Sequence, residues 1–100
     1  MQGTSRSELE RFAQLFTETA AVYAERDGVR AELVTALLLA GAALETAALA
    51  LQEGSPVAPT AQLIAATLAS DVIAAAERRG LDATLLHCVA ACRRVIELCG

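Results

Sequence analysis

One hundred residues suffice for one domain, and 55% of them belong to the apolar set AVILMFWYC. The net charge of −4, the absence of Trp and the presence of only three aromatic residues argue against a nucleic-acid partner, which needs a basic face and stacking side chains. The longest uncharged apolar run, residues 33–44, is twelve residues long and is shorter than the ~17–25 of a membrane span. Because the first dozen residues also lack the apolar stretch of a signal peptide, we expect a cytoplasmic protein without membrane contact.

The sequence predicts an all-α protein, an antiparallel up-down four-helix bundle. Ala and Leu account for 23 and 15 residues, only two prolines interrupt the chain, and no segment alternates with the two-residue period of a strand. The expected helices, joined by short loops, span about 7–26, 29–53, 60–79 and 82–99. Their apolar stripes predict a core of Leu9, Phe12, Phe16, Leu37, Leu44, Ile64, Leu68, Leu85, Cys92 and Val95.

The first helix is expected to begin at Ser7 and to end at Asp27-Gly28. Ser7 with Glu10 three residues later matches a capping box, in which each side chain bonds the other residue's backbone N–H. An apolar stripe follows at three- and four-residue steps up to Tyr23, which is typical of an amphipathic helix packed on a core.

The second helix is expected to end at Gly54, with Pro56 just beyond it. It is apolar nearly all round, since Leu38, Leu39 and Leu49 lie off its core-facing stripe. A helix of this kind is normally buried on all sides, which a four-helix bundle alone cannot provide. We therefore expect a homo-oligomer, a dimer or a tetramer, with the outer side of this helix at the interface.

The third helix is expected to begin near Thr60 and to end at Gly80, with two arginines in its last turn, where cations interact favourably with the helix dipole. Asp82 is expected to cap the fourth helix.

No catalytic motif is present, and the sequence predicts no enzyme. There is no GxGxxG, GxxxxGK[ST], HExxH or GxSxG, and the single histidine leaves no His pair for a metal. Each helix carries an acid in its inner stretch, and these acids are Glu18, Glu45, Asp71 and Glu97. Counting residues from the turns puts Glu18 and Glu45 roughly 12 Å apart along the bundle, so we interpret these acids as solvated.

The last helix holds the only concentrated chemistry, three cysteines on its apolar stripe. Cys88 and Cys92 are one turn apart, with Cβ atoms ~5–6 Å from each other, a spacing that suits a soft two-coordinate ion such as Cu(I). Cys99 lies roughly 10 Å further along the axis and is too far to share that ion. The alternative is that these thiols are simply small buried hydrophobes.

This helix resembles that of the bacterial four-helix-bundle copper storage proteins, whose last helix often reads HCxxxCRRCxxxC. Here His87-Cys88 and Cys92-Arg93-Arg94 match, Val95 replaces one cysteine, and Cys99 closes the motif. The loop 54–58, GSPVA, is also similar to the loop in that family. The resemblance implies Cu(I) ligands at Cys88, Cys92 and Cys99, with His87 as an auxiliary. The first three helices lack the family's cysteines, which implies a low capacity.

Two functions from different classes are therefore open. The first is a low-capacity soft-metal binder that holds Cu(I) on thiolates. The second is a metal-free oligomeric structural or interaction module with an apolar core.

Overall fold

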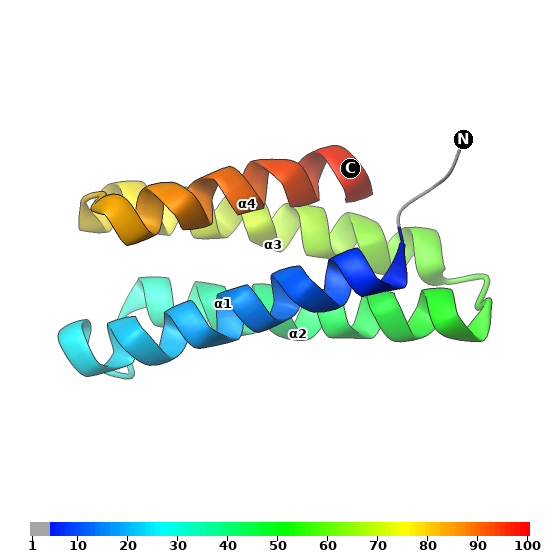
Figure 1. Cartoon of the computed structure of the whole chain (residues 1–100), viewed down its shortest axis with the longest axis horizontal. Helices are drawn as coiled ribbons and strands as arrows, with labels where there is room; N and C mark the ends of the chain where they lie inside the picture. The colour runs from blue at the N-terminus through cyan, green and yellow to red at the C-terminus, as the bar shows by residue number, and fades with distance from the viewer. Residues whose placement is uncertain (1–4) are drawn as a thin grey trace.

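The structure, a computed structural model, describes residues 5–100 and contains four helices joined by three short turns (Figure 1). They are α1 (Arg6–Asp27), α2 (Glu32–Glu53), α3 (Ala58–Arg79) and α4 (Ala83–Cys99). Each helix packs against the next one in the chain, and α1 also packs against α4, with the fewest contacts of these four pairs. The predicted all-α, antiparallel up-down bundle is confirmed, since residues 5–100 contain no strand.

The N-cap of α1 is Ser5 and not the predicted Ser7, so the helix begins at Arg6. Ser5 has extended backbone angles, and its Oγ accepts a hydrogen bond from the Glu8 N–H at 3.2 Å. Ser5 and Glu8 form the same Ser-x-x-Glu pattern as Ser7 and Glu10, two residues earlier in the chain. The predicted end is confirmed, since Gly28 follows Asp27 at φ 98°, a left-handed value that favours glycine.

The predicted starts of α2 and α3 are also wrong, each by two or three residues. Residues 28–31 form a turn, closed by a hydrogen bond from Ala31 N to Gly28 O, so α2 begins at Glu32 rather than residue 29. Helix α3 begins before Thr60, because Pro59 fits in the first helical turn, where its missing N–H has no intrahelical acceptor. The predicted ends at Gly54 and Gly80 and the Asp82 cap of α4 are confirmed.

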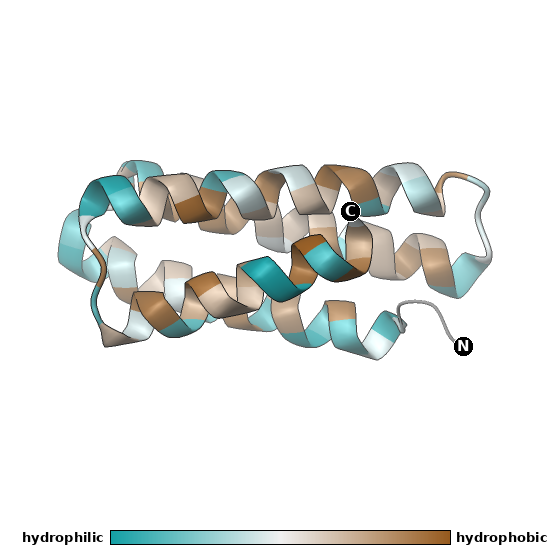
Figure 2. Ribbon diagram, turned by 90° about the horizontal axis from the view of Figure 1, so that it is seen from above, coloured by the Kyte–Doolittle hydropathy of each residue, from teal (hydrophilic) through white to brown (hydrophobic). Residues whose placement is uncertain are grey.

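The core lies on the bundle axis and contains most of the predicted residues. Those that are fully buried as predicted are Leu9, Phe16, Leu37, Leu44, Leu85, Cys92 and Val95. Phe12 and Leu68 are only partly buried and pack against the edge of this core. Figure 2 shows hydrophobic residues interleaved with hydrophilic ones along the helices, the pattern expected when each helix turns one face inward.

The predicted inward orientation of Ile64 is wrong, since its side chain is 52% exposed. The inner stripe of α3 consists instead of small residues, Ala65, Ala69, Val72 and Ala76. Residue 64 is one position before this stripe and is therefore rotated by about 100° out of the core. Apolar residues fill both sides of α3, so periodicity did not distinguish a stripe of alanines from one that includes Ile64.

The outer faces of α2 and α3 are unusually apolar. Leu38, Leu39 and Leu49 of α2 are about half exposed, as their positions off the core stripe predicted. By length and composition, α2 and α3 would each be able to cross a membrane, although helices in the core of a soluble bundle meet the same criteria.

Candidate metal centre

The thiols of Cys88 and Cys92 lie inside the bundle on adjacent turns of α4. The Asp82 carboxylate caps this helix by accepting a hydrogen bond from Leu85 N–H at 2.8 Å. The helix then presents Leu85, Cys88 and Cys92 to the core, and both cysteines are buried and free of disulfides. The apolar stripe that predicted inward-facing thiols is thereby confirmed, and the pair is shielded from water.

The two thiols share a hydrogen bond, and this bond dominates their ionisation. It raises the pKa of Cys92, whose proton is held against the Cys88 sulfur, and burial raises it further. The same bond lowers the pKa of Cys88, because it stabilises a Cys88 thiolate. The charge of Arg93 acts in the opposite direction on Cys92 and favours its thiolate. An ion that replaced this proton would bind two sulfurs that lie one helical turn apart in the core.

Cys99 and His87 do not join this pair. Cys99 is buried about two turns beyond Cys92 on α4, and burial raises the pKa of its thiol. His87 follows the outer side of α4 and is exposed, whereas the neighbouring Cys88 faces inward. No group of three or more His, Cys, Asp or Glu side chains with metal-binding geometry occurs within residues 5–100. The described chain therefore offers two thiols at one place, which is a coordination number that suits Cu(I) and not Zn(II).

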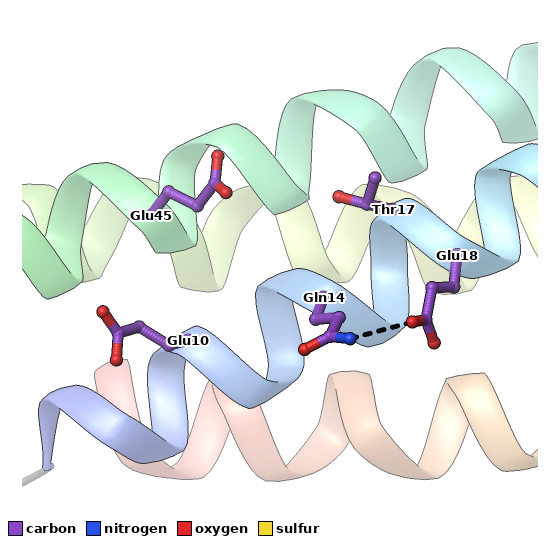
Figure 3. A pocket seen from close by; sticks show the side chains of 5 residues that line it. All are labelled: Glu10, Gln14, Thr17, Glu18 and Glu45. Atoms are coloured by element: carbon purple, nitrogen blue, oxygen red, sulfur yellow. Dashed lines mark hydrogen bonds between the residues drawn. The ribbon is translucent and has the colours of Figure 1, made fainter.

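Acids of α1 and α2 border an open hollow on the outside of the bundle. Glu10 and Glu18 of α1 and Glu45 of α2 line one open hollow of about 500 Å³ with Gln14 and Thr17 (Figure 3). Glu45 lies toward the Glu10 end of the hollow and Glu18 lies at its other end, so these two acids remain apart (Figure 3). Gln14 Nε2 donates to Glu18 at 2.9 Å, and the hollow is open to solvent, in agreement with solvated acids.

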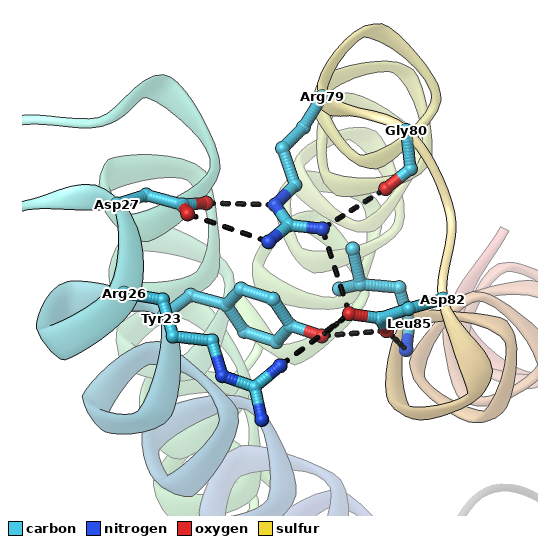
Figure 4. Close-up of polar contacts among 7 residues, drawn as sticks. All are labelled: Tyr23, Arg26, Asp27, Arg79, Gly80, Asp82 and Leu85. Carbon is cyan, nitrogen blue, oxygen red and sulfur yellow. Dashed lines mark hydrogen bonds and ion pairs between the residues drawn. The ribbon is translucent and has the colours of Figure 1, made fainter.

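A polar cluster at the turn end of the bundle was not anticipated from the sequence (Figure 4). The buried Tyr23 ring ends in a hydroxyl 2.6 and 2.5 Å from the two Asp82 carboxylate oxygens. Arg79 lies over this ring, 4.6 Å from its centroid, and donates to Asp27 at 2.7 Å, while Arg26 pairs with Asp82 at 3.5 Å. These four charged residues lie in or beside the α1–α2 and α3–α4 turns. In an up-down bundle both turns lie at the same end, so their positions in the sequence could have indicated that they meet. The cluster ties α1 to the α3–α4 turn.

Comparisons with protein-family models, with curated proteins and with solved structures found no match to this chain.

Proposed function

We propose that the protein binds one Cu(I) ion through Cys88 and Cys92. The observation that carries this proposal is the pair of free thiols, one helical turn apart and both buried in the core, with which no third His, Cys, Asp or Glu is grouped within residues 5–100. Cu(I) accepts two soft sulfur ligands, whereas Cu(II) prefers nitrogen and oxygen, so a dry thiol pair favours the reduced ion. The resemblance of the motif from His87 to Cys99 to copper storage proteins supports the same choice of metal. Reduced thiols also suit the cytoplasm, which is where we propose that the protein acts.

Binding has a cost that sets the expected affinity. Both sulfurs must be thiolates to act as ligands, and the raised pKa of Cys92 opposes that step. Arg93 offsets part of the cost by favouring the thiolate. Because Cys99 lies two turns beyond Cys92, we expect it to contribute little, and the stoichiometry should be about one ion per chain.

An anaerobic titration with Cu(I) in competition with a strong chelator tests the proposal. The wild type should take up about one equivalent, and the double variant Cys88→Ala, Cys92→Ala should lose this uptake. Cys99→Ala is the matched control, since it removes a buried thiol of the same helix and should keep full uptake. Circular dichroism before and after heating shows whether each variant still folds. Equal uptake by the double variant would refute the site, and no uptake by the wild type would refute the metal function.

The second candidate is a metal-free oligomeric module, and one observation favours it. Leu38, Leu39 and Leu49 of α2 are each about half exposed on one side of the bundle, where a second subunit would cover them. The oligomeric mass of the metal-free protein separates this candidate from a monomeric Cu(I) binder.

A further inference from the structure

The outward face of α2 carries a stripe with the spacing of a coiled-coil seam. Successive members are four, three, four, three and four residues apart, and all are exposed. They are Thr35, Leu39, Ala42, Thr46, Leu49 and Glu53. This alternation of three and four keeps a row of side chains on one face of a helix, where it meets a partner helix. No described segment of the bundle covers this face.

The stripe is symmetric about the level of Leu44. Leu39 and Leu49 lie five residues on either side of that level, and Ala42 and Thr46 lie two residues on either side. In an antiparallel pair of identical helices related by a two-fold axis at Leu44, each leucine therefore faces a leucine. Each small residue faces a small one, which lets the two backbones approach closely.

We propose that α2 pairs antiparallel with α2 of a second copy of this chain, around a two-fold axis at the level of Leu44. A two-fold interface must use the same patch on both subunits, and a symmetric stripe provides such a self-complementary patch. Leu39 and Leu49, 52% and 56% exposed in the single chain, become buried, with Leu39 of each copy packed on Leu49 of the other.

The charges at the two ends of α2 favour this direction over a parallel one. Glu53 is exposed in the last turn, and Glu32 in the first turn is paired with Arg78 at 2.7 Å. Arg30, just before the helix, is exposed and makes no ion pair with any residue in 5–100. The antiparallel arrangement brings Glu53 of one copy to the end that carries Arg30, Arg78 and the positive end of the helix dipole. A parallel pair would instead place Glu53 of one chain beside Glu53 of the other, where the two like charges repel.

Measurement of mass in solution tests the pairing first. Sedimentation equilibrium of the metal-free wild type should give twice the chain mass of 10.4 kDa. Leu39→Glu and Leu49→Glu should each return the mass to that of one chain. Leu86→Glu is the matched control, because Leu86 on α4 is equally exposed, at 57%, but lies outside the stripe. A wild type that stays monomeric at its highest soluble concentration would overturn the proposal.

Site-specific cross-linking tests the direction and register. A chain with Ala42→Cys mixed with a chain with Thr46→Cys should give mostly the mixed pair on treatment with a short bismaleimide. The wild type, whose own cysteines are buried, serves as the control for background. Cross-linking of each variant mainly to itself would indicate a parallel pair and would overturn the register.

Two further outcomes are distinguished by the same variants. If the wild type is monomeric and binds lipid vesicles, and Leu39→Glu abolishes that binding, the stripe is a membrane surface and the pairing is wrong. The Cu(I) titration is independent of these results, because neither Cys88 nor Cys92 belongs to the stripe.

Discussion

The Tyr23 hydroxyl and the Asp82 carboxylate join the end of α1 to the beginning of α4, with Tyr23 Oη 2.6 Å from Asp82 Oδ1. The same oxygen accepts the hydrogen bond from Leu85 N–H that caps α4. One carboxylate therefore both begins a helix and holds α1 against it. Because α1 and α4 make the fewest contacts of the neighbouring helix pairs, this link closes the least supported seam of the bundle.

Replacing Tyr23 by Phe should destabilise the protein while preserving its fold. The ring stays buried, but the hydroxyl that donates to a charged carboxylate is lost, which typically costs about 1–3 kcal/mol. For a domain of this size, each kcal/mol corresponds to a fall in Tm of ~4–8 °C. Thermal unfolding followed by circular dichroism measures the change, and an unaltered Tm would show that the hydrogen bond does not support the seam.

Stability should decrease at acid pH through Asp82. Its hydrogen bond from Tyr23, and then that from Leu85 N–H, lower the pKa of this carboxyl in the folded state. A lowered folded pKa contributes stability above the unfolded value of about 3.9, and this contribution is lost as the pH falls through the folded pKa. The pKa of Asp27 is lowered by its hydrogen bond with Arg79, so it acts in the same direction.

The variant Asp82→Asn isolates the contribution of Asp82, because asparagine still caps a helix but does not titrate. Urea unfolding of both proteins at pH 7 and at about pH 2.5 measures the free energy of unfolding. The wild type should have the larger free energy of unfolding at pH 7. The difference in this free energy between the wild type and Asp82→Asn should decrease at about pH 2.5. A difference that is constant with pH would contradict this assignment.

Cu(I) binding should depend on Arg93 and not on Arg94. The charge of Arg93 favours the Cys92 thiolate, whereas Arg94 pairs with Glu97 at 3.2 Å on the outer side of α4. Arg93→Gln should weaken Cu(I) binding by about two- to five-fold, the effect of an exposed charge worth ~0.5–1 kcal/mol. Arg94→Gln is the matched control and should bind as the wild type does. The difference should diminish at high salt, because the field of an exposed charge is screened.

The affinity for Cu(I) should also rise with pH. Metal and protons compete for the two sulfurs, and the raised pKa of Cys92 keeps its proton bound in the metal-free protein. Chelator competition at several pH values, with proton release followed in an unbuffered sample, measures the effect. An affinity that does not change with pH would argue against thiolate ligation.

Glu45 should oppose the α2 pairing. It is one residue from the level of Leu44, on the side of the stripe that faces α1, so the two copies of Glu45 lie on the same side of the helix pair. Like charges near each other repel, and Glu45→Gln should tighten the dimer by about two- to five-fold. Glu77→Gln on α3, an exposed acid away from the stripe, is the control for net charge. An equal gain from both variants would assign the effect to overall charge rather than to this position.

Local chemistry in the sequence determined where the helices end and which face of α4 is buried. Gly28, Gly54 and Gly80 each end a helix at positive φ, a conformation that glycine adopts without strain. Asp82 begins α4 by capping, which depends only on its own neighbours. The burial of Cys88 and Cys92 follows from the period of the apolar residues around them, and that period was unambiguous.

The tertiary structure decided the features that depend on how the helices are placed against one another. The register of α3, with Ala65 inside and Ile64 outside, is set by how closely α3 packs on its neighbours, since small residues allow close approach. Glu18 and Glu45 line one hollow because α1 and α2 pack side by side. Tyr23 reaches Asp82, 59 residues away in the chain, only because both turns lie at one end of the bundle. No local pattern encodes such a contact, because it depends on the relative position of two helices.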